Sequence, residues 1–416
     1  MVSKPRHIVL TPSTECLKTL RLRNTRYEKI SSHYEHTFQW LWESPEYSKW
    51  LSMEGSGLLF IEGKPGSGKS TLLRYFADRF NAPVSGTIVA KFFYSHRDGE
   101  LERNHKSMLR CLLYEILKND ESLFMHFQQE YRNLRDPEVD TIPKAWGYER
   151  LKAVLRDCLQ HPLKRSFFLI IDAMDESDHC DRADIVNFLR EVSTPARPTA
   201  GGCVVKVFLA SRPINEIHHV SIPADQRIRL QEKNREDIER YTHCLLKKPI
   251  FSSCRDDIKE KIRDYIVKHA DGVFLWVRVV GNELEKHCSE GLAPRKMLEF
   301  LESLPRELEG YYEYILQGLN GGDEDSTRDG TRILQFCLFS HRPVGLLELW
   351  DALGIPGEIP PLSLDLAPLS WEDDKPGDIR LRLTKCAGSF VEVRSISDLH
   401  ANVSSKSPRE IFAPTP

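Results

Sequence analysis

Short apolar runs alternate with amphipathic segments through the first half of the chain. The runs are bounded by Gly, Pro or Asp and are too short for helices. They are Leu58–Ile61, Thr87–Tyr94, Phe167–Ile171, Val204–Ala210 and Ile228–Leu230. The segments of helical period between them are Thr71–Phe80, Lys106–Lys118, Tyr148–Gln160 and Arg182–Val192. This order predicts an α/β unit with a parallel sheet, and continuous apolar runs indicate strands that are buried on both faces.

Helical patterns replace the strands after Arg235. They cover Glu236–Leu246, Asp256–His269, Gly272–Lys286, Arg295–Leu304 and Leu308–Leu319. Beyond a polar break at 320–326, two further helices and two short strand-like pieces have the outline of a winged helix; these are Thr331–Phe339, Gly345–Leu353, Ile379–Leu383 and Phe390–Val393. We therefore expect a helical lead-in (1–52), an α/β core (53–234), a helical domain (235–319), a winged-helix-like region (331–395) and a disordered tail (396–416).

Composition excludes several classes of protein. The 416 residues carry 58 Lys and Arg against 61 Asp and Glu, so the chain lacks the basic character of a nucleic-acid binder. Residues 331–395 have seven Lys or Arg against nine Asp or Glu, which argues against DNA binding there. No apolar run is long enough to span a membrane. The ten cysteines form no Cys-x-x-Cys pair, so we expect neither a zinc site nor disulfides, and a cytoplasmic location.

A phosphate-binding loop follows the first predicted strand. Gly63-Lys-Pro-Gly-Ser-Gly-Lys-Ser70 fits G-x-x-x-x-G-K-[ST] between a strand and a helix, a context that disfavours a chance match in a surface turn. Glycines allow the tight turn and leave backbone N–H groups open to phosphate oxygens. The residues predicted to bind nucleotide phosphates are Gly63, Gly66, Ser67, Gly68, Lys69, Ser70 and Thr71. Lys69 would reach the β- and γ-phosphates, and the Ser70 hydroxyl would ligate Mg²⁺.

Acidic residues stand where a second buried strand ends. Asp172 directly follows Phe167–Ile171 and is predicted to be the second Mg²⁺ ligand. Asp175 and Glu176 lie on the loop that leaves the strand, where a carboxylate could orient and deprotonate the attacking water. We favour Glu176 for its longer side chain and keep Asp175 as the alternative. The competing interpretation is that both acids cap the helix that begins near Arg182.

An arginine follows the fourth strand. Arg212 follows the predicted strand Val204–Ala210 in the segment Ser211-Arg212-Pro213. A cation at that strand end could distinguish a triphosphate from a diphosphate through a charge-assisted hydrogen bond. The competing interpretation is an exposed turn arginine, because most arginines lie at the surface.

Taken together, these segments resemble the NACHT family of STAND nucleotide switches, in particular the fungal incompatibility proteins. The resemblance covers roughly residues 16–355. The segments that carry it are Cys16–Leu20, Arg26–Ile30, Trp42–Tyr47, Gly63–Ser70, Asp172–Glu176, Ser211–Pro213, Ala270–Arg278, Leu301–Pro305 and Ile333–Pro343. Among them, Asp172-Ala-Met-Asp-Glu176 looks like the extended acidic motif of the family.

The resemblance implies a P-loop NTPase sheet in which the strand before Arg212 lies between the phosphate-loop strand and the acidic strand. It implies ATP or GTP with Mg²⁺ as ligands, slow regulatory hydrolysis, and a triphosphate-driven opening that leads to self-association or to binding of an effector protein. Family members usually carry an effector domain and a repeat array. Neither is found here, so we expect a short gene product or a truncated one.

Two other readings stay open. A metabolic P-loop kinase or ATPase would have the same loop, although about 100 residues between Lys69 and Asp172 and the following helical region are more than a simple kinase needs. A nucleotide-binding fragment without independent activity is the other. No motif reports on the base, so ATP and GTP remain equivalent at this point.

Overall fold

A computed structural model describes most of the chain. The residues described are 17–22, 24–80, 86–134, 146–162, 164–194, 202–219, 222–291, 293–305, 324–340, 344–354, 391–395 and 410–414, with single positions at 310, 313, 317, 383, 386 and 387. The chain divides into two compact units, Met1–Asp237 and Ile238–Pro416.

The first unit is built on a sheet of five parallel strands in the order β2-β3-β4-β1-β5. The strands are β1 (Gly57–Glu62), β2 (Thr87–Phe93), β3 (Ser166–Asp172), β4 (Val204–Ser211) and β5 (Arg227–Arg229). All five predicted strands are present. Strand β4 lies between β1 and β3, as the family resemblance implies. The predicted fold class, an α/β P-loop NTPase sheet with flanking helices, is confirmed.

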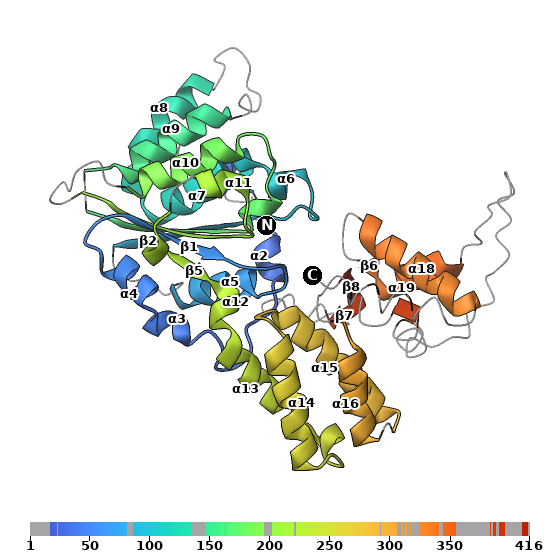
Figure 1. Cartoon of the computed structure of the whole chain (residues 1–416). Helices are drawn as coiled ribbons and strands as arrows, with labels where there is room; N and C mark the ends of the chain where they lie inside the picture. The colour runs from blue at the N-terminus through green and yellow to red at the C-terminus, as the bar shows by residue number, and fades with distance from the viewer. Residues whose placement is uncertain are drawn as a thin grey trace, which may run out of the picture. The chain divides into compact units, whose positions relative to one another are not determined.

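Each face of the sheet carries its own apolar core. Along β3, Leu169 and Ile171 belong to one core, whereas Phe168 and Ile170 belong to the other. This alternation follows from the period of two in a strand. Helices α7, α9 and α10 cover the first face, and α3, α4 and α5 cover the second (Figure 1). Because both faces are covered, the strands are apolar along their whole length.

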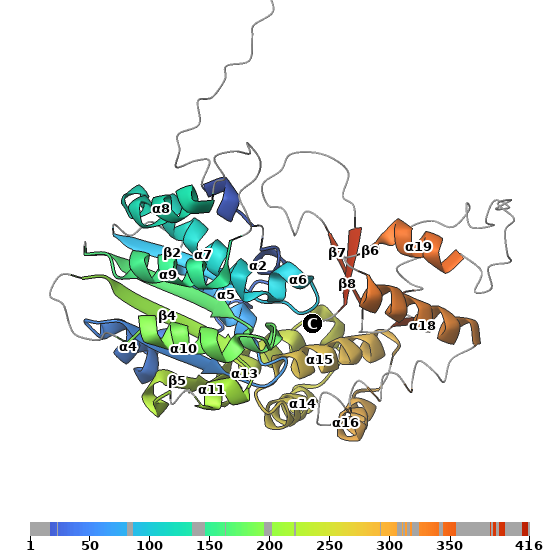
Figure 2. The same ribbon diagram turned by 90° about the horizontal axis from the view of Figure 1, so that it is seen from above.

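The four helices of this unit that begin at Lys69, His105, Tyr148 and Arg182 match the expected segments closely, and the other helices around the sheet were not expected. The full set around the sheet is α5 (Lys69–Phe80), α6 (Glu100–Arg103), α7 (His105–Asn119), α8 (Phe124–Leu134), α9 (Tyr148–Leu159), α10 (Arg182–Val192), α11 (Asn215–His219) and α12 (Leu230–Lys233). Helix α8 was not expected from the sequence, although Phe127 on it is fully buried. Figure 2 shows the same layers from above.

The lead-in consists of short helices and forms hydrogen bonds with helix α5. Its elements are α2 (Arg26–Lys29), α3 (Trp40–Glu43) and α4 (Pro45–Ser52). Gln39 Nε2 and Trp42 Nε1 donate hydrogen bonds to the Tyr75 hydroxyl at 3.1 and 3.2 Å, and the Arg74 guanidinium donates to the Ile30 carbonyl. The lead-in is therefore bonded along one side of the helix that follows the phosphate loop.

Helices dominate the second unit. The long helix α13 (Arg235–Leu246) crosses the division between the units, and α14 (Asp256–His269), α15 (Phe274–Ser289) and α16 (Pro294–Ser303) follow it. Their shared core includes Ile262, Trp276 and Leu301. Of the expected helix Leu308–Leu319, the structure describes three positions, 310, 313 and 317, and all are helical.

The C-terminal part combines two helices with a small antiparallel sheet. Helices α18 (Glu324–Phe339) and α19 (Leu346–Gly354) accompany β6 (Val344–Gly345), β7 (Val391–Ser395) and β8 (Glu410–Pro414) in the order β6-β8-β7. Strand β7 matches the second strand-like piece. The first piece was wrong where it is described, because Leu383 is helical, and 379–382 lie outside the described residues.

The predicted disordered tail also needs correction. Strand β8 lies within 396–416 and pairs with both β6 and β7. Its sequence, Glu-Ile-Phe-Ala-Pro, is short and ends in Pro, so the composition predicts a strand only weakly. Pairing with a strand on each side stabilises it. The winged-helix interpretation of 331–395 stays a prediction.

Candidate functional site

The phosphate loop leaves the sheet from a fully buried strand. All of β1 is buried, and the loop turns through Gly66 (φ 70°) and Gly68 (φ 97°), in the left-handed region that glycine adopts without strain. At Gly63 a Cβ atom would lie 2.6 Å from Ser67 Oγ and 3.2 Å from Leu230 Cβ. Three of the predicted loop glycines are therefore required by conformation or by close approach.

Residues outside the motif contact the loop and form hydrogen bonds with its backbone. Asn234 Nδ2 donates a hydrogen bond to the Ser67 carbonyl at 2.7 Å, and the Gly63 amide donates to the Ser211 carbonyl at 3.3 Å. The Phe38 ring lies 3.5 Å from where a Cβ of Gly68 would stand. Sequence reasoning missed Asn234 and Phe38, because only long-range packing brings them to the loop.

The Lys69 ammonium is bent back onto its own loop. Its Nζ donates to the carbonyls of Gly63 and Lys64 at 2.8 and 2.9 Å. Burial lowers the pKa of Lys69, and the carboxylates of Asp175 and Asp172 oppose this effect; Arg212 adds to it and Glu176 opposes it. The charged residues predicted from three separate segments therefore surround one ammonium group.

Helix α5 begins at the loop and brings two predicted hydroxyls with it. Ser70 and Thr71 occupy the second and third positions of the helix, where backbone N–H groups carry partial positive charge. The Ser70 hydroxyl lies close enough to Asp172 to lower the pKa of that carboxyl. The two predicted Mg²⁺ ligands are therefore neighbours.

Asp172 is completely buried at the end of β3. Neither carboxylate oxygen has a hydrogen-bond partner among the described residues. Burial raises the pKa of Asp172 to about 6, and Ser70, Arg26 and Lys69 oppose that rise. A buried carboxylate without partners is costly unless a cation compensates it. A hydroxyl beside such a carboxylate is an oxygen donor set that suits Mg²⁺, which usually keeps its remaining ligands from water and phosphate.

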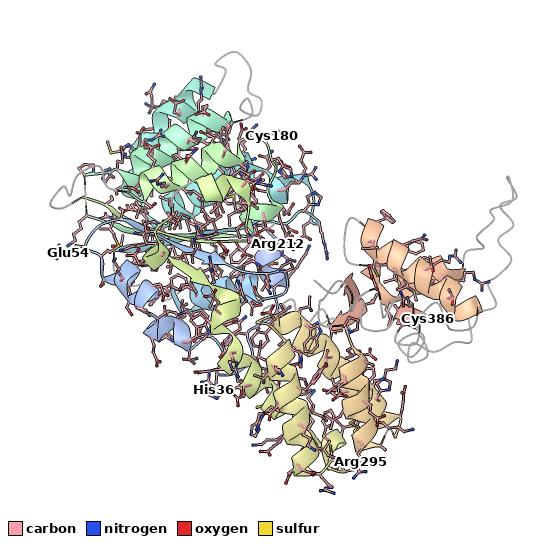
Figure 3. All side chains as sticks on the ribbon, in the orientation of Figure 1. His36, Glu54, Cys180, Arg212, Arg295 and Cys386 are labelled. Carbon is pink, nitrogen blue, oxygen red and sulfur yellow. The ribbon has the colours of Figure 1, made fainter. Side chains whose placement is uncertain are left out.

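Asp175 is bonded to the end of strand β4. Its Oδ1 accepts hydrogen bonds from the Arg212 amide at 2.9 Å and from Ser211 Oγ at 3.2 Å. Its Oδ2 lies 3.2 Å from Arg212 Nε in an ion pair. Arg212 follows the carboxyl end of β4, which pairs in parallel with β1 and β3, and it is labelled in Figure 3. The arginine is therefore held by the acidic loop.

Glu176 is engaged differently. Among the described residues its Oε2 accepts one hydrogen bond, from the His96 amide at 3.1 Å, on the loop after β2. Neither acid caps helix α10, whose N-cap position is Asp181. The interpretation of Asp175 and Glu176 as helix caps is therefore wrong.

A buried arginine, Arg182, donates hydrogen bonds to the acidic loop. Arg182 is 3 % exposed and donates to the Asp175 carbonyl at 3.2 Å and to Ser177 Oγ at 3.0 Å. It also forms an ion pair with Glu216 at 3.4 Å. Sequence reasoning placed Arg182 only as a helix start. A charged residue at that start, ten positions after Asp172, gave no signal of this role.

Among the helices that the structure describes, none combines the length and the apolar character needed to cross a membrane.

The chain is similar in sequence to a known protein family and to a fungal protein. The family described as nephrocystin 3, N-terminal, matches residues 36–212. The vegetative incompatibility protein HET-E-1 of Podospora anserina is 25 % identical over 391 residues, which are 91 % of this chain and 27 % of that protein. The chain thus spans about a quarter of the length of this relative.

Two solved structures illustrate the likeness in backbone trace. Drosophila ORC bound to DNA matches with a TM-score of 0.41 and 9 % identity, covering 100 % of this chain and 93 % of that chain. Cdc6p of Pyrobaculum aerophilum matches with a TM-score of 0.38 and 14 % identity, covering 94 % of each.

Proposed function

We propose that this chain, a NACHT-type P-loop protein, is a nucleotide-driven switch that binds ATP or GTP with Mg²⁺ and hydrolyses it slowly. One observation carries the proposal. The ends of β1, β3 and β4 bring Lys69, Asp172 and Arg212 together, although they are far apart in sequence. A cation, a metal-binding carboxylate and a second cation around one loop are the groups that phosphoryl transfer requires.

The roles of the loop residues follow from their positions. The backbone N–H groups of Gly66–Ser70 and the start of α5 would bind the phosphates. Ser70 and Asp172 would hold Mg²⁺, which would neutralise negative charge on the phosphates. Lys69 would exchange its two carbonyl partners for phosphate oxygens, a replacement of neutral acceptors by charged ones.

The two acids of the following loop are assigned different tasks. Asp175 has both oxygens engaged with the end of β4, so we assign it to positioning Arg212. Within the described part of the chain Glu176 accepts one hydrogen bond, from a backbone amide, and we assign it to orienting the attacking water. This choice agrees with the longer reach of the glutamate side chain.

The switch is proposed to depend on Arg212. A terminal phosphate would compete with Asp175 for the guanidinium, whereas a diphosphate would leave the ion pair intact. A ligand can shift a conformational equilibrium only through such a difference in affinity between two states. The triphosphate form would then self-associate or bind an effector protein. The similarity to a vegetative incompatibility protein supports a role in self/non-self defence.

Nucleotide released from the purified protein identifies the base. Saturating Mg²⁺ with that nucleotide should raise the free energy of unfolding by roughly 2.7 kcal/mol at a hundredfold excess over the dissociation constant. Lys69→Ala should abolish the gain, and Lys261→Ala, an exposed lysine on α14, should keep it. Equal responses of Lys69→Ala and wild type to every nucleotide tested would refute the proposal.

A further inference from the structure

Helix α12 and the residue that ends it contact the phosphate loop at two places. The Cβ atom of Leu230, the first residue of α12, lies 3.2 Å from where a Cβ of Gly63 would stand. Asn234 directly follows the helix, and its Nδ2 donates a hydrogen bond to the Ser67 carbonyl at 2.7 Å. Residues four positions apart on a helical turn are neighbours on one face. One face of this segment therefore reaches both the start and the middle of the loop.

Asn234 is itself held in place. It is completely buried, and its backbone N–H donates to the Leu230 carbonyl at 3.2 Å, which closes the last turn of α12. A carbonyl oxygen can only accept a hydrogen bond, so the side-chain atom that faces Ser67 is the amide nitrogen. The direction of this bond is thus determined: Asn234 donates, and the loop accepts.

Ser67 is enclosed on its side-chain face as well. The residue is completely buried, and its Oγ lies 2.6 Å from where a Cβ of Gly63 would stand. Within the described residues, Asn234 is the hydrogen-bond donor to its carbonyl. A buried carbonyl that loses its donor is costly, so this bond has no cheap replacement.

The bond from Asn234 fixes the orientation of one peptide group. The Ser67 carbonyl and the Gly68 N–H belong to the same planar trans peptide, and they point in opposite directions. In the described part of the chain, the Gly68 N–H donates to no acceptor. Gly68 has a φ of 97°, and glycine adopts positive φ about as readily as negative φ. The conformation of Gly68 therefore does not hold the peptide in one orientation, and the restraint comes from Asn234.

We propose that Asn234 is a positioning residue of the phosphate loop, which keeps the N–H of the Ser67–Gly68 peptide directed at the phosphates. The inference rests on the proposed function. If the peptide turned over, a carbonyl oxygen would replace an N–H group in a site that binds anions through N–H groups. Asn234 would act on diphosphates and triphosphates alike. It would leave hydrolysis itself unchanged, because Glu176 and Arg212 lie on other segments.

The test replaces Asn234 by Leu, which has a side chain of similar size and branching but no donor. The control is Ser56→Ala, which removes another buried hydrogen bond, from the Val205 amide to Ser56 Oγ at 2.9 Å. Ser56 precedes β1, at the opposite end of that strand from the phosphate loop. Calorimetry on the full chain gives the dissociation constants of Mg²⁺ with pyrophosphate, ADP, ATPγS, GDP and GTPγS. Pyrophosphate is included because it probes the loop without a base.

Asn234→Leu should weaken pyrophosphate and every nucleotide that wild type binds by the same factor, roughly tenfold, since the buried carbonyl loses its donor. At saturating nucleotide the hydrolysis rate should stay within about twofold of wild type, as expected when binding is lost equally from ground state and transition state. Asn234→Ala, which removes the donor without adding apolar atoms, should show the same pattern. Ser56→Ala should lower the melting temperature and keep every dissociation constant.

The alternative is a purely structural role for Asn234. Asn234→Leu and Asn234→Ala would then melt earlier, as Ser56→Ala does, and bind all probes as tightly as wild type; this result overturns the inference. A fall in hydrolysis at saturating nucleotide with unchanged affinities overturns it too. If wild type binds neither pyrophosphate nor any nucleotide, the proposed function falls and this inference falls with it. If wild type binds them and both Asn234 variants bind equally well, only the role of Asn234 is refuted.

Discussion

Replacing Asp172 by Asn should stabilise the metal-free protein while removing its response to Mg²⁺ and nucleotide. The carboxylate is completely buried, and its oxygens have no hydrogen-bond partner among the described residues. The folded protein therefore holds a charge that water would solvate better. The amide has nearly the same shape and no charge, so the penalty for burying that charge disappears with the substitution.

The magnitude follows from the pKa of Asp172, which burial raises from 3.8 to about 6. Such a difference corresponds to about 3 kcal/mol above pH 7. The sign is destabilising, because the folded state binds the proton more tightly than the unfolded state does. The penalty grows as the pH rises from about 4 to about 6 and is complete above that range. Because an amide is still polar, we expect Asp172→Asn to gain about 1–3 kcal/mol at pH 7.5.

Urea denaturation in EDTA, followed by tryptophan fluorescence, measures this difference. The gap between Asp172→Asn and wild type should shrink as the pH is lowered from 7.5 to 5. Asp175→Asn is the control, because that carboxylate is paired with Arg212 and should gain nothing when neutralised. With Mg²⁺ and nucleotide the order should reverse, since wild type alone retains the metal ligand. An Asp172→Asn protein that is no more stable than wild type in EDTA at any pH would refute the reasoning.

Two further predictions concern the acidic loop and the core. Glu176→Gln should keep the affinity for nucleotide and slow hydrolysis at least roughly tenfold, as loss of general-base assistance does; unchanged turnover in a phosphate-release assay would move that role elsewhere. Phe76→Ala should cost about 3–5 kcal/mol, because Phe76 is fully buried and its ring lies 4.6 Å from that of Phe208. Leu51→Ala, at a side chain that is 41 % exposed, should cost far less in the same denaturation experiment.

Local pattern was enough for the strands and for helices α5, α7, α9 and α10 of the first unit. A buried parallel strand such as β3 is apolar throughout, so its run is visible without any knowledge of its neighbours. The position of β4 between β1 and β3 came from the family resemblance, because chain order alone does not determine strand order. In the C-terminal part, β8 forms by pairing with β6 and β7, and its own composition does not predict a strand.

The site shows the same division. Motif spacing predicted Lys69 and Ser70 as site residues, because phosphate binding restricts residue types at fixed distances along the loop. Asp172 was predicted from its position at the end of a buried apolar strand. The ion pair of Asp175 with Arg212 joins two strand ends that only the folded sheet brings together. Asn234 and Arg182 act through backbone carbonyls, and such contacts impose no pattern on the sequence.

The bonds between the lead-in and helix α5 have a thermodynamic consequence. The helix that starts at the phosphate loop shares the Tyr75 hydroxyl and the Arg74 guanidinium with the segment around Ile30–Trp42. Coupling between two binding events is reciprocal. If nucleotide changes the affinity of this segment for a partner protein, that partner must change the affinity for nucleotide by the same factor. A partner that binds the lead-in could therefore change nucleotide affinity without contacting the nucleotide.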